Sequence, residues 1–327
     1  MPLTSIEICA GAGGQALGLE QAGFKHLAVV ELDRHACATL RRNRPFWNTV
    51  EEDLTTWRAV RYRGTIDLFA GGVPCPPFSK AGKQLGADDD RDLFPTALRL
   101  IRECQPRAVL LENVRGLLDE RFKPYREDLE AKLAADGYVC HWKLHHASDF
   151  GVPQLRPRTL LVALKREVDR NFAWPKEKPG SAPTVGDALR DLMKAHGWRG
   201  AEAWAAGATR IAPTLVGGST KHGGPDLGPT RARAEWARLG VNGKLLALEA
   251  PEAGFHGSPA LTVQMTAVLQ GFPIDWEFMG KKTYAYRQVG NAFPPPVARA
   301  VGRKIAQALR AADRAIVVDG ESAVVAA

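Results

Sequence analysis

The sequence of 327 residues contains little that would tie the protein to a membrane. No apolar run reaches the ~18 residues that a transmembrane helix needs. The N-terminal segment MPLTSIEICAGAGG also lacks the basic, apolar and small-residue regions of a signal peptide. We therefore expect a cytoplasmic protein that has no membrane partner.

Paired cysteines and clustered metal ligands are absent as well. The five cysteines, Cys9, Cys37, Cys75, Cys104 and Cys140, have neither the spacing of a zinc site nor that of a disulfide framework. As isolated cysteines they are expected to be small buried residues, except Cys75, whose surroundings differ. None of the eight histidines shows ligand spacing. The sequence therefore predicts no metal.

Acidic residues are fewer than basic residues. The formal net charge is +8 and the isoelectric point is near 9.3. This balance fits a polyanionic partner such as nucleic acid, although many basic proteins bind none. Hydrophobic residues make up 45% of the chain, which allows a substantial core, and the length fits one large domain with a smaller one.

The first half of the chain alternates apolar runs with helical patterns. Apolar runs without polar alternation, typical of buried parallel strands, lie at residues 5–10, 26–31, 65–70 and 107–112. Helical patterns lie between them at residues 15–22, 34–43 and 93–104. This rhythm predicts an α/β fold with a doubly wound, mostly parallel sheet, whose ligands bind at the carboxyl ends of the strands.

The composition and periodicity of the sequence change near residue 166. Proline, glycine and tryptophan become frequent and periodicity fades, until ordered patterns resume near Leu261. We expect a first domain at residues 1–168, an inserted loop-rich domain at 169–258, and a return to the first domain at 259–327. The return ends in an amphipathic helix that opens with prolines, and its last nine residues are expected to fray.

A glycine-rich segment, GAGGQA, spans Gly11–Ala16 between a predicted strand and a predicted helix. It satisfies the pattern G-x-G-x-x-G/A, and Glu31 follows Gly11 by twenty residues at the end of the next strand. The glycines allow a ligand to approach the backbone, and the acid can accept hydrogen bonds from ribose hydroxyls. The pattern indicates an adenosine-containing cofactor without distinguishing NAD, FAD and S-adenosylmethionine; a tight turn without a ligand is the alternative. Asp53 could accept a hydrogen bond from an adenine amino group or cap a helix.

The stretch GGVPCPPFSKAGKQLG places Cys75 between prolines, which fix the backbone on both sides of the thiol. A thiolate is a strong nucleophile when positive charge lowers its pKa, and Lys80, Lys83 or arginines from elsewhere could supply that charge. The polar, glycine-containing segment that follows is typical of a lid that closes over a substrate. A proline-rich surface turn with an incidental cysteine is the alternative.

Further polar residues lie where predicted strands begin or end. Glu112 emerges from a buried strand, where a carboxyl group can have a raised pKa and act as an acid. Gln154, Arg156 and Arg158 alternate as the chain enters a strand. Because residues i and i+2 share a strand face, we expect all three side chains to point into one site.

Together and in this order, these segments resemble the DNA (cytosine-5) methyltransferase family. The matching motifs are EICAGAGG, VELD, EEDLT, GGVPCPPFS, DRDLF, LENV, QLRPR, LQGFP and YRQVGNAFPPPVA. They cover nearly the whole chain except residues 169–258, where the family has its target recognition domain. The resemblance implies the Rossmann-like fold of class I S-adenosylmethionine-dependent methyltransferases. Cys9 departs from the family's usual aromatic residue, and Gln264-Met265 departs from its usual Arg-Glu pair.

The resemblance also implies a mechanism. The Cys75 thiolate adds to carbon 6 of a cytosine that has been flipped out of the duplex. Glu112 hydrogen-bonds or protonates ring nitrogen 3, while Arg158 and, less directly, Arg156 bind the base oxygen or a phosphate. Carbon 5 then takes the methyl group of S-adenosylmethionine. Loss of the carbon-5 proton and of Cys75 leaves 5-methylcytosine and S-adenosylhomocysteine.

The binding residues that the resemblance implies fall into two sets. The cofactor pocket is expected to consist of Cys9, Ala10, Gly11, Gly13, Gly14, Glu31, Leu32, Asp53, Leu54, Pro74, Leu93 and Asn291. The DNA contacts are expected to be Ser79, Lys80, Lys83, Gln84, Thr214, Lys221, Arg231 and Arg233. The basic residues of the second set can read guanine edges or hold phosphates.

We therefore expect a monomer that methylates duplex DNA, associates with the nucleoid through that DNA, and acts alone or beside a restriction endonuclease. A tRNA cytosine methyltransferase with the same catalytic residues is the near alternative. An NAD-dependent oxidoreductase would explain the glycine loop and Glu31 but not the cysteine between prolines. A DNA-binding relative without catalysis is opposed by the intact Cys75 and Glu112.

Overall fold

The computed structural model describes residues 2–74, 92–217 and 226–325, with side chains as far as residue 315. Within these ranges seven strands form one sheet in the order β3-β2-β1-β4-β5-β7-β6. The strands are β1 (Leu3–Ile8), β2 (Phe24–Glu31), β3 (Thr49–Glu51), β4 (Leu68–Gly72), β5 (Ala108–Val114), β6 (Tyr138–His146) and β7 (Pro157–Lys165). Neighbours from β3 to β5 are parallel, whereas β7 is antiparallel to both β5 and β6. The predicted doubly wound, mostly parallel sheet is confirmed.

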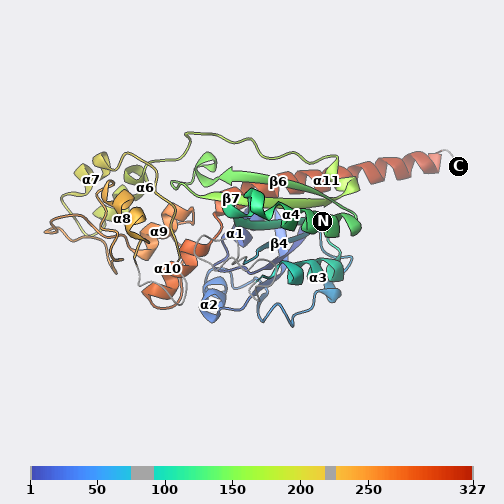
Figure 1. Cartoon of the computed structure of the whole chain (residues 1–327), viewed down its shortest axis with the longest axis horizontal. Coiled ribbons are helices and arrows are strands. Elements are labelled where there is room, and N and C mark those ends of the chain that lie inside the picture. Colours follow the sequence, from blue (N-terminus) through green and yellow to red (C-terminus); the bar gives the residue numbers. More distant parts are fainter. Residues whose placement is uncertain (1, 75–91, 218–225, 326–327) are drawn as a thin grey trace.

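Helices cover both faces of this sheet (Figure 1). The helices of the larger domain are α1 (Gly14–Gln21), α2 (Arg34–Asn43), α3 (Phe94–Cys104), α4 (Lys123–Ala135), α5 (Arg166–Asp169) and α11 (Pro295–Val325). On β4, Leu68 and Ala70 belong to the apolar cluster with α1, α5 and α11, whereas Phe69 belongs to the cluster with α3 and α4. Because successive residues of a strand face opposite sides, the central strands need almost continuous apolar sequences.

Residues 169–258, which we call the small domain, contain helices α6 (Val185–Lys194), α7 (Ala201–Gly207) and α8 (Thr230–Ala237). Its described residues contribute isolated bridges but no strand of the sheet. Helices α9 (Val263–Gln270) and α10 (Lys282–Asn291) lie between the small domain and α11 (Figure 1). One apolar cluster joins Leu40 and Trp47 of the larger domain to Leu215 of the small domain and Leu269 of α9. The predicted boundaries at 168 and 258 stay predictions, since this shared core crosses the junction.

Both ends of strand β4 differ from the sequence-based expectation of residues 65–70. Strand β4 starts at Leu68 rather than residue 65; just before it, the Asp67 carboxylate accepts hydrogen bonds from the Thr4 backbone N–H (2.8 Å) and from Arg107 (3.0 Å). It continues to Gly72 because Gly71 approaches β1 so closely that a Cβ atom there would lie 2.6 Å from Ile8. The extra residues of β4 carry the chain to the segment that contains Cys75.

The C-terminal helix α11 extends to Val325, through residues that were expected to fray. After its opening prolines the segment contains no further proline and is rich in alanine, so nothing in the sequence ends the helix. Although α11 has 31 residues, neither it nor another helix in the described ranges is apolar enough over sufficient length to cross a bilayer.

Candidate active site

Glu112 and Arg158 form a buried ion pair at the end of the central strands. The antiparallel register of β5 and β7 places Val114 opposite Arg158 and Glu112 opposite Leu160. The Arg158 Nε atom lies 2.7 Å from Glu112 Oε1, and the two side chains are 14% and 11% exposed. Burial raises the pKa of Glu112, while the positive charges of Arg158 and Arg156 oppose that shift. The acid that the sequence predicted at this strand end is present, together with a cation beside it.

The chain approaches Cys75 directly beside this pair. Gly72 pairs with Glu112 across the parallel strands β4 and β5. The Asn113 side-chain amide donates a 2.9 Å hydrogen bond to the Val73 carbonyl. Asn113 is therefore a positioning residue that motif reasoning left without a role, although its place beside Glu112 in LENV was a usable signal. Cys75 itself, and the predicted DNA contacts Ser79, Lys80, Lys83, Gln84 and Lys221, lie outside the described residues.

The glycine loop is tied to the end of β2 through Glu31. The Gly11 N–H donates to Glu31 Oε2 at 2.7 Å, and the N–H groups of Leu32 and Asp33 donate to Oε1 at 2.8 Å each. The carboxyl ends of parallel neighbours β1 and β2 meet at one edge, which brings residues twenty positions apart into contact. Oε1 thus accepts two hydrogen bonds, whereas Oε2 accepts one and keeps a further lone pair that could accept from a ligand hydroxyl.

The shape of the loop requires glycine at specific positions. Gly11 and Gly13 have φ of +54° and +84°, in the left-handed region that side chains disfavour. A Cβ atom on Gly14 would overlap the carbonyl oxygen of Phe293, just before α11, whereas one on Gly11 would meet nothing within 4 Å. Cys9 also adopts a positive φ of +49°, and burial raises its thiol pKa, so this cysteine stays protonated.

The other residues predicted to bind the cofactor differ in position and in exposure. Asp53 lies beyond the end of β3, with its Oδ1 atom accepting from the N–H and hydroxyl of Thr55 at 2.8 and 2.9 Å. These bonds lower its pKa, so it is a carboxylate at neutral pH. Leu54 is buried, whereas Leu32 is 64% exposed. Pro74 and Leu93 lie on either side of the segment that contains Cys75, joined by a backbone bond of 3.5 Å.

These residues fit an adenosine-containing cofactor. The open space above Gly11, the Glu31 carboxylate and the exposed Asp53 carboxylate all lie at the carboxyl ends of β1, β2 and β3. Asn291 ends α10 and is exposed near Gly217, where a Cβ atom would clash with its side-chain oxygen. A cofactor with ribose hydroxyls and an amino-bearing base would find acceptors here.

The structure corrects one geometric expectation. Strand β7 begins only at Pro157, so the alternating side chains of Gln154, Arg156 and Arg158 do not share a strand face. Of the three, Arg158 alone pairs with Glu112 among the described residues. Arg156 is fully buried and donates to the backbone carbonyls of Leu215, Gly290 and Ala292 at 2.8 to 2.9 Å. The direct contact of Arg156 with the base or a phosphate stays a prediction without support from this geometry.

The predicted DNA contacts within the described residues lie on the small domain. The hydroxyl of Thr214 donates to the Leu155 carbonyl. On α8, Arg231 is exposed and has no ion pair with a described residue, whereas Arg233 lies 3.6 Å from Asp226. Arg231 is therefore the better placed of the two to meet an external anion.

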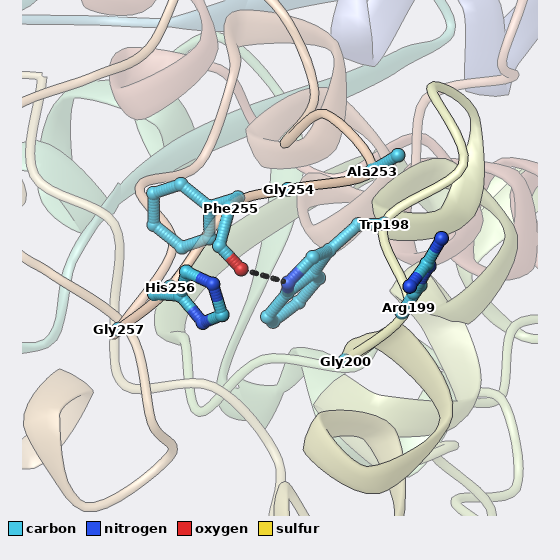
Figure 2. Close-up of a pocket in the computed structure, with 8 residues that line it drawn as sticks. All are labelled: Trp198, Arg199, Gly200, Ala253, Gly254, Phe255, His256 and Gly257. Atoms are coloured by element: carbon cyan, nitrogen blue, oxygen red, sulfur yellow. Dashed lines mark hydrogen bonds between the residues drawn. The ribbon is translucent and has the colours of Figure 1, made fainter.

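A pocket of about 450 Å³ lies in the small domain (Figure 2). It is lined by Trp198, Arg199, Gly200, Ala253, Gly254, Phe255, His256 and Gly257. The Trp198 indole N–H donates to the Phe255 carbonyl at 2.9 Å, which joins its two walls. None of the predicted site residues lines it. Across the described ranges, no three His, Cys, Asp or Glu side chains form a metal site.

Comparisons with known proteins agree with this geometry. The family model for C-5 cytosine-specific DNA methylase matches residues 3–307. The type II methyltransferase M.NgoMIV of Neisseria gonorrhoeae is 54% identical over 314 residues, which are 95% of this chain and 99% of that protein. The type II methyltransferase M.NaeI of Lentzea aerocolonigenes is 56% identical over 313 residues, which are 94% of this chain and 75% of that protein.

Solved structures show the same fold at lower identity. The crystal structure of a DNA modification methyltransferase encoded within an E. coli prophage has a TM-score of 0.66 at 24% identity and covers 94% of this chain and 99% of that one. The S. pombe Dnmt2 methyltransferase has a TM-score of 0.62 at 18% identity and covers 94% of this chain and 98% of that one. The likeness extends over both the larger and the small domain.

Proposed function

Because the chain belongs to the C-5 cytosine-specific DNA methylase family and is a DNA cytosine-5 methyltransferase, we propose that it methylates a flipped cytosine in a specific duplex sequence through a covalent cysteine adduct. The observation that supports this most directly is the buried Glu112–Arg158 pair beside the strand that leads to Cys75. An acid with a raised pKa, a cation and a thiol are the groups that activation of a cytosine ring requires.

The protein's part in the reaction follows from the chemistry of these groups. Carbon 6 is shielded in stacked DNA, so the cytosine leaves the helix at a cost of a few kcal/mol. Protonated Glu112 donates a hydrogen bond to ring nitrogen 3, which withdraws electrons from carbon 6 and lets the Cys75 thiolate add there. Arg158 stabilises negative charge on the base oxygen. Carbon 5 thereby becomes nucleophilic, and loss of its proton later expels Cys75.

S-adenosylmethionine, when bound, supplies the electrophilic methyl group. We propose that Gly11, Gly13 and Gly14 receive its methionyl part, that Glu31 binds the ribose hydroxyls, and that Asp53 accepts from the adenine amino group. The other members of the pocket are Cys9, Ala10, Leu32, Leu54, Pro74, Leu93 and Asn291. The glycines, Glu31 and Asp53 lie at the carboxyl ends of β1, β2 and β3, respectively.

We further propose that the enzyme is a cytoplasmic monomer that works with a restriction endonuclease, since the relatives named above are type II methyltransferases. DNA from cells that express it is then expected to resist cleavage by an endonuclease whose site includes the methylated sequence. Cleavage of that DNA to the same extent as DNA from cells without the enzyme would contradict this partnership.

Bisulfite sequencing of DNA from expressing cells tests the activity and gives the recognition site. The wild-type protein should protect one cytosine of a short repeated sequence from conversion, and Cys75→Ser should protect none. Cys140→Ser is the matched control, because Cys140 lies on β6 and has no part in the proposed chemistry. Unprotected DNA with wild-type protein, or methyl transfer to tRNA instead of duplex DNA, would overturn the proposal.

A further inference from the structure

Five residues from four separate segments form a closed ring of buried hydrogen bonds at the domain junction. The Leu215 N–H donates to Gln154 Oε1 at 2.9 Å, and Gln154 Nε2 donates to Gln270 Oε1 at 2.6 Å. Gln270 Nε2 donates to the carbonyl of Ala292. Arg156 closes the ring by donating to that same carbonyl at 2.9 Å and to the Leu215 carbonyl at 2.9 Å.

The ring is fully enclosed by protein. The side chains of Gln154, Arg156 and Gln270 are all 0% exposed, and Leu215 is 1% exposed. An unpaired polar group in such a place would destabilise the fold, so each member depends on its neighbours. No carboxylate of the described residues lies within ion-pair distance of Arg156, and its charge is held by backbone carbonyls.

The ring joins the parts of the protein that must cooperate in the reaction. Leu215 follows Thr214, a predicted DNA contact, and both of its backbone polar groups are held. Gly290 and Ala292, which accept from Arg156, flank Asn291 of the proposed cofactor pocket. Arg156 is also two residues from Arg158, the partner of Glu112. The small domain, the cofactor segment and the catalytic pair therefore share one rigid connection.

We propose that Gln154, Arg156 and Gln270 are positioning residues that hold the small domain in register with Glu112 and Arg158, so that a cytosine in bound DNA reaches the catalytic pair. This inference rests on the proposed function. Arg156 touches neither base nor phosphate; its planar fork spans two segments, which a lysine ammonium on a flexible stem does not reproduce. Misalignment of about 1 Å between bound groups can reduce a rate about 100-fold.

The test compares Arg156→Lys and Gln270→Met with Arg107→Lys as the matched control. Arg107 is also a well-bonded arginine, to Asp67 at 3.0 Å and Asp313 at 2.6 Å, but it lies at the opposite end of β5. Amide hydrogen exchange of the peptide containing Leu215 is measured first, because it needs no substrate. Steady-state methyl transfer then gives kcat, the KM for duplex DNA and the KM for S-adenosylmethionine.

Both ring variants should accelerate exchange at Leu215, raise the KM for DNA about tenfold and lower kcat by up to about 100-fold, with the KM for the cofactor changed less than about twofold. Arg107→Lys should leave exchange at Leu215 and both KM values unchanged. Wild-type exchange and wild-type KM for DNA with a reduced kcat in Arg156→Lys would overturn the inference, because an arginine that binds the reacting base behaves so. Equal effects of Arg107→Lys would also overturn it. Absent methyl transfer by the wild type would refute the proposed function, and the exchange data would still decide the role of the ring.

Discussion

The carboxyl ends of the strands and the domain junction hold their polar groups in different ways. At the strand ends, carboxylates face cations or backbone N–H groups and keep lone pairs or exposed edges, as Glu31 and Asp53 do. At the junction, Gln154, Arg156 and Gln270 are sealed from solvent and bond to each other and to the backbone, with only Arg156 Nε lacking a partner among their described side-chain atoms. Arg158 and Arg156 show this difference, because Arg158 pairs with the Glu112 carboxylate whereas Arg156, among the described residues, donates only to backbone carbonyls. Residues that bind a ligand keep free hydrogen-bond acceptors, whereas residues that position the ligand-binding segments form their hydrogen bonds within the protein.

The largest effect is expected from Glu112→Gln, which removes the proposed acid at the strand ends. An amide can donate a hydrogen bond to ring nitrogen 3 but cannot transfer a proton to it, so kcat should fall about 10²–10⁴-fold in a methyl-transfer assay. The variant also leaves Arg158 buried without its carboxylate, which lowers stability. Glu103→Gln is the control, since Glu103 lies in the last turn of α3 and pairs with Arg58 and Arg99. Activity retained by Glu112→Gln would remove the acid from the mechanism.

A second prediction concerns the stability that depends on His26, whose ring contacts the carbonyl of Ala16 at the end of the glycine loop. Burial lowers its pKa from 6.5 to about 4, and its ring nitrogens face Ser5 Oγ and the Ala16 carbonyl at 2.9 Å. The unfolded chain binds the proton more tightly, so stability is full above pH 6.5 and is lost as pH falls toward 4. Between pH 7 and pH 5 this should cost about 2 kcal/mol.

Urea unfolding at the two pH values measures that loss. His26→Gln should show a smaller decrease between pH 7 and pH 5 than the wild type, by about the same 2 kcal/mol. An identical decrease in both proteins would mean that His26 is not held neutral by the fold.

A third test sharpens the role of the glycine loop. Gly11→Ala and Gly64→Ala both place a methyl group at a positive φ with no atom within 4 Å, so each should cost about 1–2 kcal/mol of stability. Only Gly11→Ala should also weaken binding of S-adenosylmethionine, by about tenfold in calorimetry, since its methyl group enters the proposed cofactor space. Equal cofactor affinity in both variants would move the cofactor away from this loop.

The smallest effect is expected on the small domain. Arg231→Ala should weaken DNA binding several-fold and reduce the slope of log K against log salt by about one, as for loss of one phosphate contact. Lys244→Ala on the same domain serves as a comparison for a general change in charge. An unchanged salt slope in Arg231→Ala would exclude a phosphate contact by this arginine.

The sequence predicted the strand ends better than the junction, for physical reasons. The link between Gly11 and Glu31 follows from parallel strands that end at one edge, a rule that local patterns express well. The position of Glu112 was predicted in the same way. Its pairing with Arg158 depends on the antiparallel register of β5 and β7, which is set by long-range contacts that a local pattern does not contain.

The junction was mispredicted where a local rule was extended beyond its element. Alternation applies inside a strand, but Gln154 and Arg156 precede β7 and follow the demands of buried hydrogen bonding instead. Gln270 was visible in LQGFP without any sign of its partners, because those partners, Gln154 and Ala292, come from distant segments.

The central claim is the transient bond between the Cys75 sulfur and carbon 6 of the target cytosine. Duplex DNA that carries 5-fluorocytosine at the methylated position has no carbon-5 proton to lose, so the adduct cannot resolve. Mass spectrometry after incubation with S-adenosylmethionine should find one DNA strand linked to the peptide that contains Cys75. Efficient methylation of the ordinary duplex, together with no linked peptide on the fluorinated one, would contradict the account.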